Sequence, residues 1–273
     1  MACRPKGRRP LSLLTLLEPA HVTAGFGVGV LVGMTGVGGG SLMTPLLVLL
    51  FGVHPVTAVG TDLLFAALTK SAGVVAHGFN RSVDWAVTGL LAAGSVPATA
   101  ATLFVLSRIE AYGDAGRSIA TILGWALIVT SISLLFRSRI LAWAKKRFSE
   151  TPKPRTRAIA TVITGAVLGF VVSISSVGAG AIGMTVLLIL YANLPLVRLV
   201  GSDIAHAVPL TLIAGAGYWW IGSVDLVLLG QLLAGSIPGI LIGSLLAPRA
   251  SERILRPLLA GVLALVGLKL ALG

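Results

Sequence analysis

The sequence predicts an all-α polytopic membrane protein of about eight transmembrane helices, arranged as two homologous four-helix halves. Hydrophobic residues make up 56% of the 273 residues, whereas charged residues make up only 11%. Two stretches, Pro19–Thr61 and Ala158–Val197, contain no Asp, Glu, Lys or Arg. Both are longer than the roughly 20 residues that a helix needs to cross a bilayer. A soluble domain carries about 25% charged residues, so this composition excludes one.

Eight apolar windows, separated by polar or turn-forming residues, mark the expected spans. They run over residues 20–51, 56–79, 85–107, 117–136, 158–190, 196–220, 225–247 and 254–272. In the first and the fifth window, glycine-rich segments are expected to break the helix. Tyr218, Trp219 and Trp220 lie near the end of a span, which is typical of an aromatic belt at the membrane interface.

The two halves of the chain repeat at a constant spacing. Val59–Leu63 matches Val200–Ile204 at a distance of 141 residues, and Gly89–Pro97 matches Gly230–Pro238 at the same distance. Because Asp, Gly, Ser and Pro anchor the match rather than generic Leu and Val, we infer a duplication. The expected organisation is a basic N-terminal segment at 1–18, a first repeat at 19–136, a basic linker at 137–157 and a second repeat at 158–273.

The net charge of +12 is clustered beside the expected spans. Of the 21 Lys and Arg residues, four lie in the first ten positions and eight lie within Arg137–Arg157. Such clusters mark cytoplasmic segments, and they argue against a nucleic-acid-binding face. With four crossings in each half, both basic segments and the C-terminus lie on the cytoplasmic side of the inner membrane. If the glycine-rich segments are re-entrant hairpins instead, each half crosses three times, the repeats are inverted and the linker changes side.

Two segments, Gly33–Pro45 (GMTGVGGGSLMTP) and Ser173–Thr185 (SISSVGAGAIGMT), place glycines inside apolar runs. Glycine costs roughly 1 kcal/mol relative to alanine in a helix interior, so both segments predict an interrupted helix. Within a bilayer, non-helical backbone persists only where protein or a water-filled cavity surrounds it, and paired breaks point to the substrate site of a transporter. Close helix packing through small residues is the alternative explanation.

A broken helix exposes backbone N–H groups at the start of its second part, and these groups form an anion site. Hydroxyl groups beside each break would add donors, so the shell suits a small anion with several acceptor oxygens. We therefore expect cradles at Gly36–Ser41 and Val177–Ala181. The expected substrate-binding residues are Thr35, Gly36, Gly38, Gly39, Gly40, Ser41, Thr44, Ser175, Ser176, Gly178, Gly180 and Lys70.

Ionisable residues within the expected spans are candidates for charge handling, because a charge is costly in a bilayer. Asp62 and Asp203 occupy equivalent positions and are candidates for ion coupling. His206 follows Asp203 by three residues on the same helical face, so this pair could carry a proton. The structural alternatives are helix capping, with Thr61 or Ser202 as the cap beside its aspartate, and a satisfied core histidine.

Lys70 lies eight residues after Asp62, a little over two helical turns away, and therefore on roughly the same side of the helix. It is a candidate for the fixed positive charge that attracts an anion. Pairing with an aspartate, or snorkelling of the side chain to the interface, are the alternatives.

The sequence contains no motif that indicates an active site for covalent chemistry. A phosphate-binding glycine loop followed by Lys and Ser/Thr is absent, and so is the His/Glu spacing of a zinc site. The lone Cys3 allows no intramolecular disulfide. We therefore expect a protein that is not an enzyme and holds no cofactor or metal. Its expected partners are a small anion, the lipid bilayer and, as an open option, further copies of the chain. An uncoupled channel and a membrane enzyme acting on lipid are the competing functions.

Three segments resemble the TauE/SafE family of membrane transporters, described as exporters of sulfite or organosulfonates. They are GMTGVGGGSLMTPLL at residues 33–47, HPVTAVGTDLLFAALTKSAG at 54–73 and GSDIAHAVPL at 201–210. The resemblance covers residues 22–272 and implies outward or proton-coupled transport of such an anion. Ala179 and Ala181 interrupt the second glycine segment, so the two halves are expected to contribute unequally.

Overall fold

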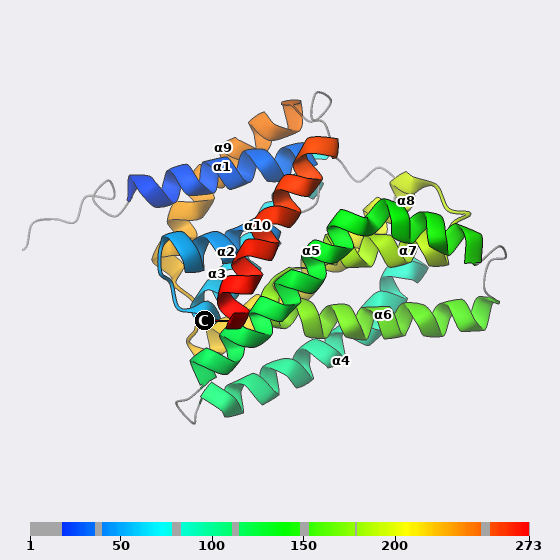
Figure 1. The fold of residues 1–273 in the computed structure, drawn as a ribbon, viewed down its shortest axis with the longest axis horizontal. Helices are drawn as coiled ribbons and strands as arrows, with labels where there is room; N and C mark the ends of the chain where they lie inside the picture. The colour runs from blue at the N-terminus through cyan, green and yellow to red at the C-terminus, as the bar shows by residue number, and fades with distance from the viewer. Residues whose placement is uncertain are drawn as a thin grey trace, which may run out of the picture.

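The protein is described here by a computed structural model, which covers residues 18–35, 40–77, 83–110, 115–147, 153–177, 179–246 and 252–272. All regular secondary structure in these ranges is helical (Figure 1). The helices are α1 (Pro19–Thr35), α2 (Gly40–Leu50), α3 (Pro55–His77), α4 (Trp85–Glu110), α5 (Ala115–Arg147), α6 (Pro154–Ser175), a π-helical turn (Ala179–Gly183), α7 (Met184–Leu190), α8 (Leu196–Ile221), α9 (Leu226–Leu246) and α10 (Glu252–Leu272).

Most helix boundaries agree with the apolar windows of the sequence. The first residues of α3, α4, α8, α9 and α10 lie within two residues of the expected starts. The exception is α5, which continues to Arg147, while α6 begins at Pro154. Much of the expected linker at 137–157 is therefore helical, because Lys, Arg and Ala are good helix formers and proline is favoured in the first turn of a helix.

By length and composition, several helices can cross a membrane. Within the part of the chain that the structure describes, four segments are both long and apolar enough: Trp85–Arg108, Pro154–Ser175, Val197–Ile221 and Leu226–Gly243. Shorter apolar helices cover Pro19–Met34, Ala120–Phe136 and Ala260–Leu272. The chain is thus an all-helical protein with the composition of a polytopic membrane protein.

Each glycine-interrupted segment folds back on itself. The ring of His21, near the start of α1, lies 4.5 Å from the ring of Phe51, just after the end of α2. In the second half, the Thr161 hydroxyl near the start of α6 lies 2.9 Å from the hydroxyl of Tyr191, just after α7. The pair α1–α2 and the pair α6–α7 are therefore helical hairpins. This arrangement corresponds to the re-entrant hairpins that the sequence analysis gave as an alternative. It does not correspond to a broken helix whose second part continues across the membrane.

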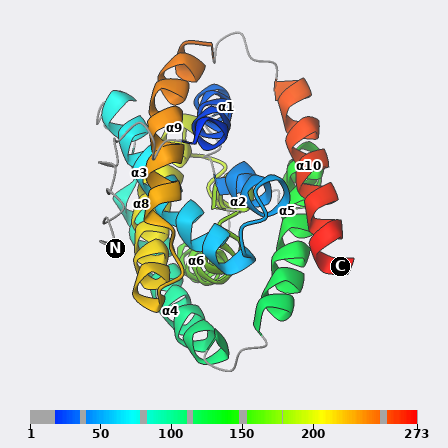
Figure 2. The ribbon, with the colours of Figure 1, turned by 90° about the vertical axis from the view of Figure 1, so that its left-hand side faces the viewer.

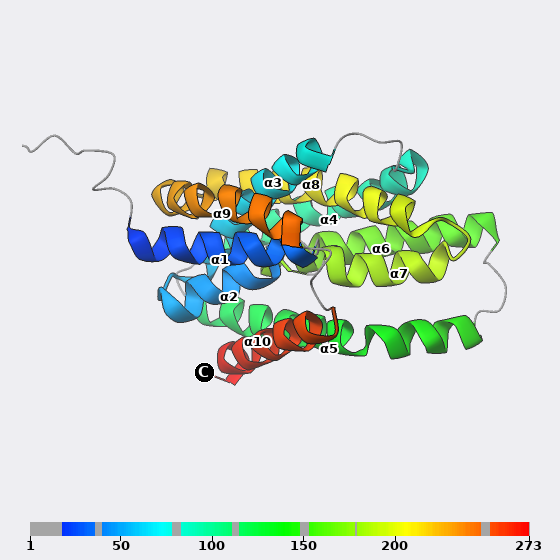
Figure 3. The same cartoon turned by 90° about the horizontal axis from the view of Figure 1, so that it is seen from above.

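The first helix of each hairpin packs against a helix from the other half of the chain, α1 on α9 and α6 on α4 (Figures 1 and 3). Glycine makes this possible, since a Cβ on Gly25 would lie 2.3 Å from the carbonyl oxygen of Leu232 and one on Gly165 would lie 2.1 Å from that of Leu91. These are small-residue contacts that let the two backbones approach closely, and they lie outside the two glycine-rich segments singled out from the sequence.

Two further helix pairs, α3 with α8 and α5 with α10, run antiparallel. Gly60 faces Tyr218, whereas Gly215, closer to the start of α8, faces Leu64, further along α3. The hydroxyl of Ser131 on α5 donates to the carbonyl of Ala260 on α10 over 2.7 Å. Figure 2 shows α5 and α10 side by side at one flank of the molecule.

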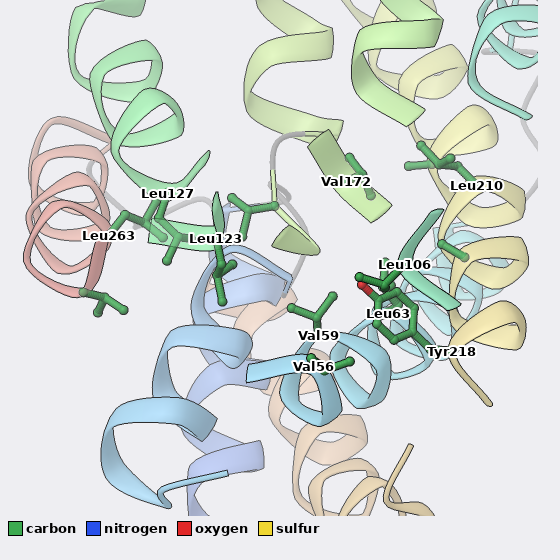
Figure 4. Packing of buried hydrophobic residues seen from close by; sticks show 14 residues of the cluster. Val56, Val59, Leu63, Leu106, Leu123, Leu127, Val172, Leu210, Tyr218 and Leu263 are labelled. Carbon is green, nitrogen blue, oxygen red and sulfur yellow. The ribbon is translucent and has the colours of Figure 1, made fainter. Parts of the chain in front are cut away.

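Buried apolar side chains from six helices meet in the main core cluster (Figure 4). Val59 and Leu63 of α3 lie near Tyr218 of α8 in this view. Leu127 of α5 and Leu263 of α10 close the opposite side of the cluster. The core therefore joins both halves of the chain, and it lies beside the two aspartates described next.

Candidate functional site

Both interruptions predicted from the glycine segments are present at the expected places. In the first half, α1 ends at Thr35 and α2 begins at Gly40. In the second half, α6 ends at Ser175, and the π-helical turn that contains Gly180 precedes α7. Gly36, Gly38, Gly39 and Gly178 lie outside the described residues, and the side chains of Thr35 and Ser41 are likewise not described.

The second break is closed by two serines. Ser176 has a φ of 56°, in the left-handed region that non-glycine residues rarely adopt, and its N–H donates to the carbonyl of Val172 over 2.7 Å. The Ser175 hydroxyl donates to the carbonyl of Val171 over 2.7 Å and accepts from the N–H of Val177 over 3.2 Å. Both serines are buried, and together they satisfy backbone groups that the helix end would leave unpaired.

Asp62 binds the first turn of the returning helix α2. Its Oδ2 accepts the N–H of Thr44 at 3.1 Å and the hydroxyl of Thr44 at 2.5 Å. Asp62 and Thr44 are both fully buried. A protein carboxylate thus occupies part of the helix-start position where the sequence analysis placed a substrate anion, because the donors there attract any negative group.

Ser176 brings the second break to the same carboxylate. Its hydroxyl lies beside Asp62 but completes no well-formed hydrogen bond there. Within the described residues, Ser176 Oγ and Asp62 Oδ1 are buried polar atoms without a hydrogen-bond partner. Buried atoms of this kind are rare in native proteins, and an ion, a water or a ligand is the usual explanation.

Asp203 occupies the equivalent place against the second hairpin. A Cβ on Gly183, the last residue of the π-helical turn, would lie 2.8 Å from Asp203 Oδ1. A side chain at this position would therefore force the Asp203 carboxylate to shift. Asp203 is 6% exposed, so both aspartates lie within the protein.

Lys70 links the two aspartates electrostatically. Its ammonium group interacts with the carboxylates of both Asp62 and Asp203, and its charge also acts on His206. The Nε2 atom of His206 lies 2.8 Å from the hydroxyl of Ser95 on α4, whereas its Nδ1 has no hydrogen-bond partner within the described residues. The structure thus brings the predicted charge-handling residues near one another. We call this group the central cluster: the buried residues Asp62, Asp203, His206, Thr44, Ser176 and Ser95, with the half-buried Lys70.

The capping role considered for Thr61 and Ser202 is wrong. α3 begins at Pro55 and α8 at Leu196, so both residues lie well inside their helices. The hydroxyl of Thr61 accepts the N–H of Asp225 at 3.1 Å, and that of Ser202 accepts the N–H of Asp84 at 2.8 Å. Each half therefore binds the start of a helix from the other half, an arrangement that local sequence signals do not reveal.

Sequence reasoning also misplaced Tyr218 and overlooked two hydroxyl groups. Trp220 is 90% exposed, as expected for an interfacial belt, but Tyr218 is buried and its hydroxyl donates to the carbonyl of Ser173 over 2.8 Å. Thr99 accepts the hydroxyl of Ser173 at 3.2 Å. The sequence marks Ser95 only as part of the repeat match between Gly89–Pro97 and Gly230–Pro238. That match is the signal that could have identified Ser95 as a candidate site residue.

The fold and the central cluster together indicate a general class of protein. An all-helical chain with membrane-length apolar helices, and with its charged residues gathered inside between two hairpins, is organised as a membrane transport protein is. The chain belongs to the family described as sulfite exporter TauE/SafE, whose model matches residues 22–270. Members of this family are membrane transporters.

Curated relatives carry the same general description. The chain is 39% identical over 253 residues to the probable membrane transporter protein YjnA of Bacillus subtilis (strain 168), covering 91% of this chain and 98% of the relative. It is 30% identical over 250 residues to the probable membrane transporter protein YdhB of the same strain, covering 88% and 97%. A probable membrane transporter protein of Xylella fastidiosa (strain 9a5c) is 28% identical over 241 residues, covering 86% and 87%. No solved structure shows significant similarity to this chain.

Proposed function

We propose that the protein is a secondary transporter that moves a small anion, sulfite or an organosulfonate, across the cytoplasmic membrane. The observation that carries the proposal is a set of buried polar atoms in the central cluster that find no hydrogen-bond partner among the described residues: Asp62 Oδ1, Ser176 Oγ and His206 Nδ1. They lie between two helix breaks and near the ammonium group of Lys70. A charged site beside paired helix breaks suits a substrate that binds, is occluded and is released.

Lys70 would supply the attraction for the anion. Two carboxylates and one ammonium group leave the cluster with an excess of negative charge, so an anion binds well only when a carboxylate takes up a proton or a cation. This requirement favours coupling to protons over free diffusion. Asp203 and His206 are the groups proposed to carry the proton, since His206 has a ring nitrogen available.

The helix directions support inverted repeats. Helices that correspond at the 141-residue spacing, α3 with α8 and α5 with α10, run antiparallel, whereas a two-fold axis along the membrane normal would make them parallel. The axis proposed here therefore lies in the membrane plane, and alternating access follows when each hairpin in turn closes the cluster.

Inverted repeats place the linker on one face and both termini on the other. The eight basic residues of 137–157 outnumber the four in the first ten positions, so the positive-inside rule favours a cytoplasmic linker with both termini outside. This orientation differs from the sequence-based expectation, which placed all three segments in the cytoplasm on the assumption of four crossings in each half.

The test is uptake of labelled sulfite into proteoliposomes, with and without an imposed pH gradient. We expect saturable flux that responds to the gradient, and at least a tenfold loss of flux in Lys70→Ala and Asp203→Asn. Lys269→Ala is the matched control, because Lys269 is an exposed lysine on α10. Saturable flux that ignores the gradient would remove the coupling, and poorly saturating flux would favour an uncoupled channel. No flux above empty liposomes would exclude sulfite, and sulfonates and other small anions would be measured next.

A further inference from the structure

A second polar site lies at the open end of the hairpin α6–α7, away from the central cluster. A half-open cavity of about 230 Å³ is lined there by the start of α4, the start of α6 and the turn after α7. Its walls include Asp84, Val87, Leu90, Arg157, Tyr191 and Asn193. Arg157 precedes Ser176 by 19 residues, roughly 28 Å along α6, so this cavity is separate from the central cluster.

One wall of the cavity carries a positioned cation. The guanidinium carbon of Arg157 lies 4.9 Å from the centre of the Tyr191 ring. The Tyr191 ring is itself fixed, because its hydroxyl lies 2.9 Å from that of Thr161. The ring contact engages the guanidinium through its charge, and its five N–H donors can also bind a planar or tetrahedral anion.

Another wall carries a positioned anion. Asp84 Oδ1 accepts the N–H groups of Ala86 at 3.1 Å and Val87 at 3.2 Å, which caps the start of α4. The backbone N–H of Asp84 donates to the hydroxyl of Ser202 over 2.8 Å, so the residue is held from both sides. A capping carboxylate still has further lone pairs that can accept a donor from a ligand.

The cavity lies where two membrane-length apolar helices begin, and a spanning helix meets the headgroup region at its ends. Two membrane-length apolar segments, Trp85–Arg108 and Pro154–Ser175, both begin at its walls. Trp85 is 68% exposed beside it, as is common at the membrane–water interface. The apolar walls Val87, Leu90 and Leu194 adjoin the two charges. The volume is below that of an ordinary small-molecule site, about 300–1,000 Å³, and suits a headgroup fragment.

We propose that this cavity binds the headgroup of a zwitterionic aminophospholipid, with the phosphate on Arg157 and the ammonium on Asp84. A purely anionic headgroup would leave the Asp84 carboxylate facing a like charge. A quaternary ammonium headgroup would lack the N–H donors that a carboxylate accepts. Because the ligand contacts α4, α6 and the turn after α7, it fastens the open end of this hairpin.

Native mass spectrometry of the purified, delipidated full chain tests the proposal. The protein is titrated with phosphatidylethanolamine, phosphatidylcholine and phosphatidylglycerol that carry identical acyl chains. We expect phosphatidylethanolamine to bind at least tenfold more tightly than either of the others. Arg157→Gln should lower that affinity at least tenfold, whereas Arg155→Gln, at an exposed position on the same helical turn, should leave it unchanged.

Asp84→Asn isolates the ammonium contact, because asparagine caps a helix as well as aspartate but carries no charge. The variant should keep its fold and bind phosphatidylethanolamine and phosphatidylcholine equally. Water-soluble phosphoethanolamine distinguishes a lipid from a free zwitterion: if it binds as tightly as the lipid, the lipid assignment is overturned. Equal binding of all three lipids to the parent protein, or equal losses in Arg155→Gln and Arg157→Gln, would also overturn the proposal.

Discussion

The hairpins α1–α2 and α6–α7 meet their aspartates in different ways. In the first, Thr44 donates both its N–H and its hydroxyl to Asp62. In the second, the π-helical turn brings Gly183 against Asp203 so closely that a side chain would collide with it. The first hairpin is thus held by hydrogen bonds to its aspartate, whereas the second depends on the absence of a side chain.

The spacing of equivalent residues explains part of this difference. Gly29 and Gly169 make equivalent contacts with Ser236 and Ser95, and they lie 140 residues apart. After the breaks the spacing is 141, as for Asp62 and Asp203. A π-helical turn accommodates one extra residue within a helix, and Ala179–Gly183 lies where the spacing changes. We infer that the extra residue of the second half is taken up in this turn.

The charges of the two halves also differ. At the 141-residue spacing, His206 corresponds to Phe65 and Lys70 corresponds to Thr211. The backbone arrangement is therefore nearly symmetric, while each half contributes one basic group that the other lacks. A single ammonium group that interacts with both aspartates is the result.

The open ends of the hairpins should face opposite sides of the membrane, which is the largest effect to measure. Native Cys3 reports on the N-terminal side, and Thr151→Cys in a Cys3→Ser background reports on the linker. With an impermeant thiol reagent on intact cells, we expect Cys3 to be labelled and the linker cysteine to be protected until the cells are opened. Labelling of both from the same side would contradict the inverted arrangement.

Substitution of the glycines that pack one half against the other should destabilise the fold equally, whichever half carries the glycine. A Cβ on Gly94 would lie 1.9 Å from the carbonyl oxygen of Val162, and one on Gly235 would lie 1.9 Å from that of Val22. We expect Gly94→Val and Gly235→Val each to destabilise the fold by about 3 kcal/mol or more, since backbone must move. Thermal unfolding in detergent measures this. Gly89→Val and Gly230→Val, on the same helices with open space around them, should be much milder, and a similar loss there would refute the packing argument.

The bond between Thr44 and Asp62 should contribute a smaller but specific amount. Thr44→Val removes a hydroxyl that donates to a carboxylate, and we expect a loss of about 1.5–3 kcal/mol in the free energy of unfolding. Thr164→Val is the control, because the hydroxyl of Thr164 bonds only the Ala160 carbonyl of its own helix. Combining Thr44→Val with Asp62→Asn should cost less than the sum of the two single changes, and strict additivity would show that the contact contributes nothing.

The two hydroxyl groups that accept a backbone N–H at a helix start in the other half should have the smallest effects, and these effects should be alike. Thr61→Ala and Ser202→Ala each leave a backbone N–H, that of Asp225 or Asp84, without its acceptor. We expect about 1 kcal/mol for each change, measured by chemical unfolding in detergent. Near-additive losses in the double variant would agree with two separate contacts. A large loss from only one of them would mean that the halves are tied unequally.

Local composition was sufficient for much of the architecture and for the identity of the central residues. Apolar windows located the helices because burial in lipid requires long charge-free runs. Glycine propensity located both interruptions, and the cost of intramembrane charge selected Asp62, Lys70, Asp203 and His206. The sequence did not show that α5 continues into the expected linker, because clustered charge marks exposure to water and does not by itself end a helix.

The sequence by itself determined that the chain is helical, membrane-embedded, interrupted twice and charged at a few inner positions. These properties follow from short windows, where each residue acts through its own propensity and solvation. Only the tertiary structure decided that the interrupted helices fold back, that Thr61 binds the start of α9, and that Tyr218 turns inward to Ser173. Such contacts join residues far apart in the chain, and no local preference selects among the partners that the fold brings within reach.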